Sequence, residues 1–517
     1  MIISAHTCTD TGKMHFTLFT LPVVAGVGAC LFLLLLTYRL FFAPLSRFPG
    51  PKWTAATRLW IMYHEFKGQR TVIIDELHAK YGPVVRVAPD EVSFNDAEAL
   101  RDIYGIKSGF SKTDFYDMFV YYDEKNTFTS PTKAEHSSRK RLVADNYTKS
   151  YVMQPAVADM VRGHVAAMMD VIHQNPSVDV YQYLHYYAMD VITSHVYGAH
   201  GTNTIQEPTH RSLVYDLAGQ KHRTRLYLIY YFGVFMNVLA TAQSFLRKLK
   251  GKNSEYHVRG GDINTYGIES VLRCRATMTE KPGTATCDKL LRKIPGNNNQ
   301  VAAECMDHLV AGVDTTGDAM CVLMWKISTP ECAGVQDKLF QELSMISHSF
   351  DPHTLTASIA DLDSLPYLEA VIKEGLRWRP PVPMTLFRTV PPGEAKEISG
   401  RSIPPGTVVG CQAYSLHRNP EVFDNPDAFD PDRWFTEDEE KLRAMKLHFW
   451  PFSSGARHCL GHNIATVEMK MMIAAVYMYY TTSPGLDCTE ESMAMDDQLT
   501  SGVPYGLKCI LDFKKRP

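Results

Sequence analysis

The sequence predicts a mainly α-helical fold with a small β region, preceded by one N-terminal transmembrane helix. Three observations lead to this prediction. Residues 16–38 form an apolar run without a charged residue, long apolar or helically spaced segments occupy the second half of the chain, and the β-prone segments are short. With 517 residues, 45% of them hydrophobic, the chain can bury an extensive core.

Charge and cysteine content restrict the partners and the compartment. Lys and Arg total 53 against 56 Asp and Glu, a formal net charge of −3, so no overall positive field favours nucleic acid as a partner. The 11 cysteines are odd in number and lack the paired spacing of a zinc site or a disulfide framework. We therefore expect no nucleic-acid partner and a reducing compartment.

The apolar run over residues 16–38 matches the roughly 20 residues that a helix needs to cross about 30 Å of hydrocarbon. A secretory signal peptide is the alternative, but its apolar region is only about 7–15 residues long. Basic residues follow the run at Arg39, Arg47, Lys52 and Arg58. Only Lys13 and His15 lie close before it, so we expect residues 1–15 in the lumen and residues 53–517 in the cytoplasm.

Prolines in residues 39–52 fix φ and cannot continue a helix, so this segment is expected to be a stiff hinge. Beyond it, residues 84–87 and 92–94 read as two short strands around a turn. The polar, Gly- and Asn-rich stretch 251–299 has no sustained periodicity and is expected to be a surface connection.

A long buried helix is expected over residues 301–328, where acidic residues interrupt an otherwise apolar run. Apolar residues recur at helical spacing over residues 365–376. Short β-prone runs then flank the turn residues of segment 398–409.

Residues 452–461 form the segment with the most distinctive chemistry. Cys459 lies between Gly455 and Gly461, ahead of a helical run over residues 463–480. Glycine lets the backbone approach a flat macrocycle, a helix start favours a thiolate, and Arg457 can pair with a carboxylate of the macrocycle. A single cysteine is more often a small buried hydrophobic residue. The combination of glycines, helix start and arginine around Cys459 instead favours a cysteine that binds a metal in a macrocycle.

This segment resembles the haem-ligand signature of the cytochrome P450 family: Phe, any two, Gly, any one, Arg, any one, Cys, any one, Gly. The five defining positions match at Phe452, Gly455, Arg457, Cys459 and Gly461. The resemblance extends from the proline-rich hinge to the C-terminus. It implies the cytochrome P450 fold, haem b as the cofactor, and Cys459 as the axial ligand of the haem iron.

Two upstream segments also resemble family motifs. Glu374-Gly-Leu-Arg377 is similar to the Glu-any-any-Arg helix motif, and the segment around Arg433 is similar to an arginine-containing loop. Residues three apart share a helix face, so a buried carboxylate between two guanidiniums can hold the layer of loops beneath the haem. A solvated surface salt bridge is the alternative for Glu374 and Arg377 taken alone.

The segment 311–316, Ala-Gly-Val-Asp-Thr-Thr, resembles the oxygen-binding motif of the family. A hydroxyl beside an acid is costly in an apolar helix unless it is used. The resemblance implies that Asp314 and Thr315 are catalytic residues that deliver protons to bound dioxygen. In the structural alternative, Thr315 bonds back to a carbonyl one turn earlier and Asp314 is solvated.

The resemblance also implies haem-propionate contacts. The family commonly has Trp or His followed four residues later by Arg, whereas this chain has His136 followed by Lys140. Lysine offers a point charge where arginine offers a planar fork. Arg388 resembles another propionate contact, with an ordinary surface arginine as its alternative.

The resemblance implies a monooxygenase that inserts one oxygen atom from O2 into an apolar small molecule. Fungal microsomal members are the most similar in texture, which suggests a terpenoid or polyketide intermediate of secondary metabolism and an endoplasmic reticulum location facing the cytoplasm. Without a dinucleotide fingerprint in the sequence, we expect electrons from a membrane-bound NADPH-dependent flavoprotein reductase, with cytochrome b5 as a second donor.

Several segments flank these motifs and are candidates to face the substrate, with ordinary core as the equal alternative. They are residues 115–122, Val310, residues 382–386 and residues 503–504. A non-oxygenating haem-thiolate isomerase or dehydratase, and a membrane-tethered haem sensor, are the rival functions. The retained Asp314 and Thr315 argue against the first rival, and a sensor would not need the whole set of oxygen-activating and substrate-facing segments.

Overall fold

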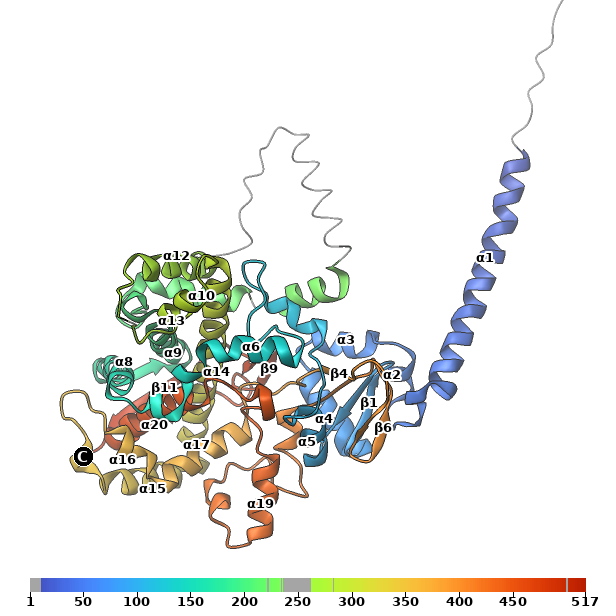
Figure 1. Cartoon of the computed structure of the whole chain (residues 1–517). Coiled ribbons are helices and arrows are strands. Elements are labelled where there is room, and N and C mark those ends of the chain that lie inside the picture. The colour runs from blue at the N-terminus through green and yellow to red at the C-terminus, as the bar shows by residue number, and fades with distance from the viewer. Residues whose placement is uncertain (1–10, 221–222, 234, 236–261, 282, 499–500) are drawn as a thin grey trace, which may run out of the picture.

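The computed structural model describes residues 11–220, 223–233, 235, 262–281, 283–498 and 501–517. Helices dominate and the strands form small sheets, which confirms the predicted mainly α fold with a small β region (Figure 1). The first helices are α1 (Thr11–Thr37), α2 (Lys52–Ala56), α3 (Leu59–Phe66), α4 (Arg70–Tyr81), α5 (Ala97–Tyr104), α6 (Lys133–Val143), α7 (Lys149–Val152), α8 (Pro155–Gln174), α9 (Val180–Tyr197) and α10 (Arg211–Gln220). The later helices are α12 (Asp262–Ala276), α13 (Thr286–Lys293), α14 (Asn298–Ser328), α15 (Ala333–Ser344), α16 (Ile359–Asp363), α17 (Pro366–Trp378), α18 (Ala413–Leu416), α19 (Glu439–His448) and α20 (His462–Tyr479).

The main sheet confirms the strand pair predicted over residues 84–94. Strand β1 (Val84–Ala88) pairs antiparallel with β2 (Glu91–Phe94), and β2 pairs parallel with β7 (Val408–Cys411), so segments far apart in sequence join in the order β1-β2-β7-β4. The remaining strands are β3 (Ser177–Asp179), β4 (Arg388–Thr389), β5 (Lys396–Ile398), β6 (Arg401–Ile403), β8 (Tyr480–Pro484), β9 (Met495–Gln498), β10 (Ser501–Pro504) and β11 (Ile510–Lys515).

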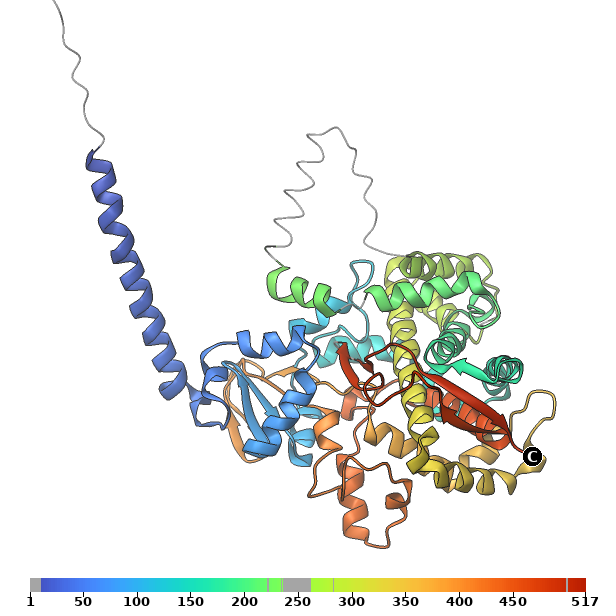
Figure 2. The same ribbon diagram turned by 180° about the vertical axis from the view of Figure 1, so that it is seen from behind.

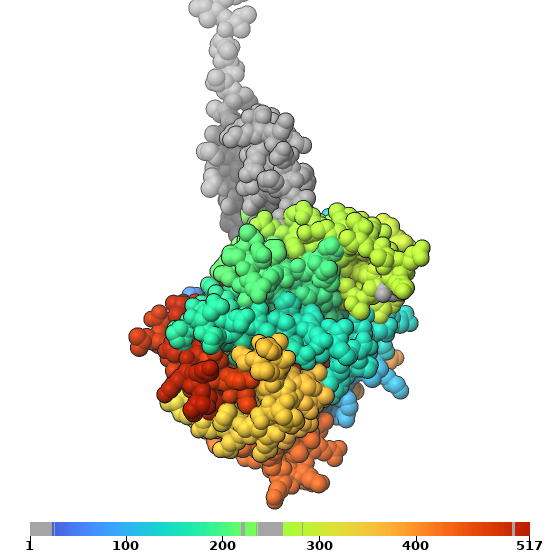
Figure 3. Space-filling model, turned by 90° about the vertical axis from the view of Figure 1, so that its left-hand side faces the viewer, coloured from blue at the N-terminus to red at the C-terminus, as the bar shows by residue number. Residues whose placement is uncertain are grey.

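The predicted long buried helix is confirmed as α14, which runs through the helical body (Figures 1 and 2). It packs against α9 over much of its length and also contacts α12, α17 and α20. Buried side chains occur along α14 from Val301 to Ser328, and many of them belong to the main hydrophobic core. Figure 3 shows that segments far apart in the sequence, coloured teal, gold and red, lie side by side on one face of the molecule.

The prediction for residues 251–299 is wrong where the structure describes them. Helices α12 and α13 lie in this stretch and pack against α14, while residues 251–261 lie outside the described part. The buried residues of α12 include Ile263, Gly267 and Ser270, of which two are not apolar. Because small and polar residues occupy part of the buried face of α12, apolar residues do not recur clearly at helical spacing. The sequence pattern therefore did not predict this helix.

At the N-terminus, α1 projects from the globular body (Figures 1 and 2). Among the described residues, no helix combines the length and apolarity required to cross a membrane. The membrane span over residues 16–38 therefore stays a prediction, and residues 1–10 of the predicted lumenal segment lie outside the described part.

The proline-rich segment 39–52 lies against the first strand of the main sheet. Its Leu45 and Phe48 are buried, and the carbonyl oxygen of Pro49 accepts a hydrogen bond from the backbone N–H of Arg86 at 2.7 Å. This hydrogen bond and the two buried side chains fix the segment to the globular part of the chain.

Candidate active site

The cysteine loop is built so that only glycine fits at its tightest point. Gly455 has φ +65°, and a Cβ there would lie 2.1 Å from the carbonyl oxygen of Tyr104. The backbone N–H of Cys459 donates to the carbonyl of Phe452 at 2.9 Å, which closes the loop. At Gly461, in contrast, an added Cβ would meet only Ile464 at 3.9 Å, so the protein itself leaves room for a side chain there.

Cys459 lies directly ahead of helix α20. Its side chain can be reached by solvent, but protein atoms surround the space into which it opens, and this is the enclosure that acts on the thiol. This enclosure raises the pKa of the thiol, whereas hydrogen bonding from the backbone N–H groups of Gly461 and His462 and the charge of Lys140 lower it. A helix start and a nearby cation are groups that stabilise a thiolate. Phe452 packs edge-on against His462, with ring centroids 4.5 Å apart, and so supports the loop from one side.

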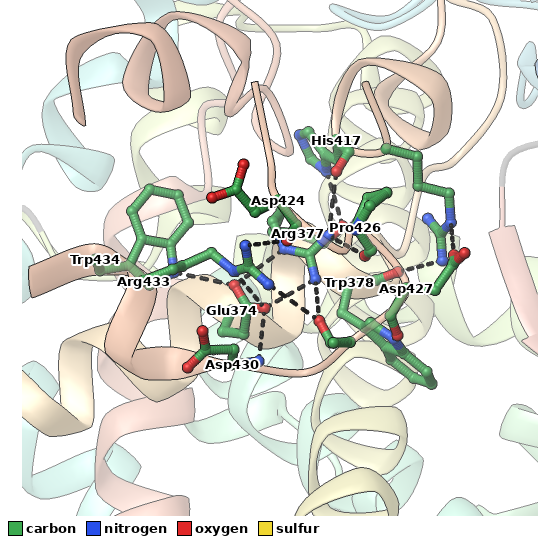
Figure 4. Close-up of polar contacts among 12 residues, drawn as sticks. Glu374, Arg377, Trp378, His417, Asp424, Pro426, Asp427, Asp430, Arg433 and Trp434 are labelled. Carbon is green, nitrogen blue, oxygen red and sulfur yellow. Dashed lines mark hydrogen bonds and ion pairs between the residues drawn. The ribbon is translucent and has the colours of Figure 1, made fainter. Parts of the chain in front are cut away.

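A charged network surrounds Glu374, in the interior of α17 (Figure 4). Glu374 and Arg377 are both 0% exposed, and Arg377 binds the carboxylate with two hydrogen bonds of 2.8 and 3.0 Å. Arg433 Nε donates to the same carboxylate at 3.1 Å, as do Trp434 Nε1 at 3.1 Å and the backbone N–H of Asp430 at 2.9 Å. The surface alternative for Glu374 and Arg377 is therefore wrong.

The remaining guanidinium hydrogens of Arg377 donate to backbone carbonyls of the surrounding loops. Its Nη1 lies 3.1 Å from the oxygen of His417 and 2.6 Å from that of Pro426, and Nη2 lies 2.9 Å from that of Ala428 (Figure 4). A buried charge that is satisfied in this way is costly to break, because removing one partner leaves the other uncompensated. Three separate loop positions are thus fixed to one helix.

His136 and Lys140 of α6 lie in one positively charged region with Arg388 and Arg457, so residues from three different parts of the chain meet there. Arg457 donates to the carbonyls of Ser130 and Pro131 at 2.9 and 2.7 Å, and Lys140 Nζ lies 3.3 Å from the carbonyl of Ala456 in the cysteine loop. Burial and then the charge of Arg388 lower the pKa of Arg457 to about 10. The cations therefore lie close enough to repel one another.

Lys112 belongs to the same region and was missed by the sequence analysis. Its ammonium is buried and lies over the rings of Tyr116 and Phe128, 4.0 and 3.8 Å from their centroids. Burial lowers its pKa well below the usual value, and Arg388 and Arg457 lower it further. A single lysine in a loop gives no periodic or spacing signal, so the sequence offered nothing to identify it.

These five residues fit the carboxylates of haem b. Within the described part of the chain none of them forms an ion pair with a carboxylate, and the buried Nδ1 of His136 has no hydrogen-bond partner. Arg139, which flanks His136, instead pairs with the buried Glu304 at 2.9 Å. Buried cations without an anionic partner are unfavourable, so a ligand with two carboxylates next to Cys459 would satisfy this region.

The acid and hydroxyl of α14 lie where the helix becomes accessible. Asp314 and Thr315 are half-buried and Ala311 is exposed, in a helix that is otherwise almost completely buried. The Thr315 hydroxyl donates to the carbonyl of Ala311 at 2.7 Å, so the back-bonding considered as the alternative is present. Its oxygen keeps lone pairs that can accept another hydrogen bond.

Two of the segments expected to face the substrate meet in one aromatic cluster. The buried members of this cluster are Phe115, Tyr116, Phe119, Tyr227, Met384 and Phe387. Met384 belongs to the second segment, and Phe387, which directly follows that segment, has its ring 5.0 Å from that of Phe115. Tyr227 comes from the helical stretch 223–233, which the sequence analysis did not include, and Val310 packs in the main core instead.

Two arginines beside the aromatic cluster, Arg58 and Arg70, are already neutralised by carboxylates. Arg70 lies over the ring of Phe387, 4.9 Å from its centroid, and forms ion pairs with Glu65 and Glu91. Arg58 pairs with Glu91 at 2.9 Å. These two arginines therefore bring no free positive charge to the aromatic cluster.

Comparison with known proteins identifies relatives along almost the whole chain. A family model described as Cytochrome P450 matches residues 48–505. The cytochrome P450 monooxygenase orf2 of Aspergillus niger is 30% identical over 88% of this chain and 90% of its own length. The cytochrome P450 monooxygenase macH of Penicillium terrestre is 29% identical (92% and 94%), and the benzoate 4-monooxygenase bphA of Aspergillus niger is 29% identical (89% and 92%).

Proposed function

The chain belongs to the cytochrome P450 family of monooxygenases, which bind haem b through a cysteine thiolate, and we propose that Cys459 is this ligand and that the enzyme inserts one oxygen atom from O2 into an apolar small molecule. Haem with a thiolate ligand supplies the electron density that promotes O–O cleavage. The observation that carries the proposal is the accessible Cys459 at the start of α20, close to cations that form no ion pair with a carboxylate among the described residues.

Each predicted residue has a task in this proposal. Gly455 lets the loop pass close to Tyr104, and Arg457, Arg388, His136, Lys140 and Lys112 hold the propionates. Glu374, Arg377 and Arg433 act structurally, because the two arginines share the carboxylate and donate to backbone carbonyls of the loops over residues 417–428. Asp314 holds and releases a proton, and Thr315 passes it on through its hydroxyl.

We propose a terpenoid or polyketide intermediate of secondary metabolism as the substrate class. The aromatic cluster supports an apolar substrate, since rings such as Phe115 and Phe387 provide large contact areas with few polar atoms. The name of bphA gives benzoate as the substrate of that relative. Because Arg58 and Arg70 are paired with Glu65 and Glu91, an uncharged substrate fits this chain better than a small carboxylate.

The electrons are proposed to come from an NADPH-dependent flavoprotein reductase, with cytochrome b5 as a second donor. We further propose that residues 16–38 anchor the chain in the endoplasmic reticulum membrane, with residues 53–517 facing the cytoplasm. The exposed apolar side chains of α1, among them Leu31, Phe32 and Leu34, support this arrangement, because such a surface is costly in water.

Incubation with isotope-labelled O2 tests the reaction. The purified full-length enzyme, reductase and NADPH are supplied with candidate terpenoids and polyketides, and products are analysed by mass spectrometry. The proposal expects one labelled oxygen atom in the product and a requirement for NADPH. Conversion that proceeds without NADPH and without label would instead identify the isomerase or dehydratase alternative.

A further inference from the structure

Helices α9 and α14 approach each other closely on both sides of Asp314. At Gly312 an added Cβ would lie 2.7 Å from Cγ1 of Ile192, and at Gly317 it would lie 2.9 Å from the ring of His185. Neither position has room for a side chain, so the two glycines bring α9 against the backbone of α14. The imidazole of His185 is thereby placed beside the helix turn that follows the catalytic acid.

His185 is surrounded by oxygen acceptors. Its Nε2 lies 3.3 Å from Oδ1 of Asp318, and its Nδ1 lies 2.6 Å from the backbone carbonyl oxygen of Tyr181. Because both ring nitrogens face acceptors, the doubly protonated imidazolium satisfies the site better than either neutral tautomer. Both side chains are buried, with Asp318 only 1% exposed, so little solvent screens the pair.

Burial of the imidazole lowers its pKa, but the ion pair with Asp318 and the charge of Asp314 raise it, and the net effect places the pKa of His185 above its usual value of 6.5. Asp318 follows Asp314 by one helical turn, so the two carboxylates share a face of α14. His185 is thus paired with Asp318 and lies beside the helix turn that follows Asp314.

Three further ionisable groups face this pair. Tyr181 lies on α9, and burial together with Asp318 and Asp314 raises the pKa of its hydroxyl. Arg379 follows α17, and burial lowers its pKa to about 10 although Cys321 and Asp318 oppose this effect. Among the described residues, the ionisable groups around this pair include Tyr181 from α9, Arg379 from the end of α17, and Asp314 and Cys321 from α14 itself.

We propose that His185 and Asp318 form a positioning pair that sets the charge beside Asp314 and thereby controls when this acid holds or releases a proton. A positive charge on an imidazole favours the charged form of a nearby carboxylate, and the neutral imidazole does not. The pair acts through Asp314 and touches neither the substrate nor Cys459. The inference rests on the proposed role of Asp314 in proton delivery.

Reciprocity provides a test that needs no turnover. If His185 changes the proton affinity of Asp314, then Asp314 must change that of His185 by the same free energy. Histidine NMR of the holoenzyme is recorded against pH for the parent, Asp318→Asn and Asp314→Asn, with His185→Gln to assign the resonance. Both asparagine variants are expected to lower the pKa of His185. An unchanged His185 titration in Asp314→Asn would overturn the proposal.

His308 supplies the matched control. It is buried on the same helix and its Nδ1 lies 2.7 Å from the hydroxyl of Tyr147, so its partner is neutral. Its titration is expected to be the same in the parent and in Asp314→Asn. A shift of both histidines would indicate a general change in structure and would also contradict the proposal.

Coupling of NADPH consumption to product separates positioning from a structural role. We expect His185→Gln and Asp318→Asn to lower the product formed per NADPH by about fivefold, with more peroxide released and unchanged haem content. His308→Gln is expected to match the parent, and Asp318→Asn carries the test if His185→Gln does not fold. Parent-like coupling in the folded variants would overturn the proposal. If the parent itself forms no oxygenated product, the proposed function fails, while the NMR result still decides whether the pair is coupled to Asp314.

Discussion

The imidazole Nε2 of His417 accepts a hydrogen bond from the backbone N–H of Trp450 at 2.8 Å. Its Nδ1 lies 3.2 Å from the carbonyl oxygen of Arg377, which assigns the proton to Nδ1. Burial, together with the charges of Arg377 and Arg418, lowers the pKa of this histidine well below its usual value, so the ring is neutral. His417 therefore connects the Glu374 network to the residue that leads into the cysteine loop.

Replacing His417 is expected to loosen this loop. His417→Phe leaves the N–H of Trp450 and the carbonyl of Arg377 without partners, which costs about 1–3 kcal/mol for each buried group. Urea unfolding and the ratio of haem to protein measure the effect. His448→Phe is the control, because His448 is half-buried and bonds to the carbonyl of Ala444 in its own helix. Equal haem loss in both variants would contradict this account of His417.

Glu374 and Glu98 provide a matched pair for the helix network. Both are followed three residues later by arginine, but Glu98 and Arg101 are 58% and 73% exposed, whereas Glu374 and Arg377 are fully buried. Glu374→Gln leaves two buried guanidiniums without a counter-charge and is expected to lower the free energy of unfolding by about 3–5 kcal/mol. Glu98→Gln is expected to change it by less than about 1 kcal/mol. Urea unfolding measures both free energies of unfolding. Similar decreases in the two variants would show that burial does not determine how strongly such an ion pair stabilises the protein.

This pair also shows what the sequence could and could not predict. Glu98 and Glu374 have the same local pattern, and burial separates them through residues distant in sequence, such as Asp430 and Arg433. The position of Glu374 and Arg377 upstream of Cys459 matched the family motif, and this match identified them correctly as the buried pair. The strong periods and apolar runs of α14, α17 and α20 were predicted for the same reason that they form: long apolar faces bury together.

The missed features lack a local signal. Lys112 bonds to the backbone carbonyl of Phe128, and His417 bonds to that of Arg377. Both roles therefore depend on contacts that only the folded chain creates. Helix α12 was missed because small and polar residues occupy part of its buried face. Local pattern thus predicted the long elements and the ligand loop, whereas the supporting contacts depend on the fold.

Stability is expected to fall as pH decreases below 6.5. Burial lowers the pKa of His78 to about 4, that of His308 to about 4 and that of His195 to about 3, whereas the unfolded value is 6.5. Between these values the unfolded chain binds more protons, so the stabilisation present above pH 6.5 is lost as the pH falls. Each histidine contributes up to about 1.4 kcal/mol per pH unit.

His78 provides the variant for this prediction because its ring is bonded to Ser93 and Gly82 rather than to the candidate site. Urea unfolding of His78→Gln from about pH 7 to about pH 5 should give a shallower decline than the parent. The raised pKa of His185 acts in the opposite direction, since its stabilising charge is present at low pH and lost as the pH rises. Parallel pH profiles for parent and His78→Gln would contradict the prediction.

Lys112 is expected to strengthen haem binding. Lys112→Met keeps an apolar stem beside Tyr116 and Phe128 but removes the charge, and the loss of a charge-assisted hydrogen bond should weaken haem retention by about tenfold or more. Transfer of haem to an acceptor protein measures retention. Lys107→Met is the control, because Lys107 is exposed in the same loop region. Parent-like retention in Lys112→Met would exclude a propionate contact.

The central claim, thiolate ligation by Cys459, is tested most directly by the carbon monoxide difference spectrum of the reduced, detergent-solubilised enzyme. The parent and Cys459→Ser are compared at matched haem content. We predict the red-shifted Soret band of a thiolate-ligated haem in the parent and its loss in the variant. Haem bound to the parent without this band, or the same band in Cys459→Ser, would contradict the assignment and with it the proposed oxygen insertion.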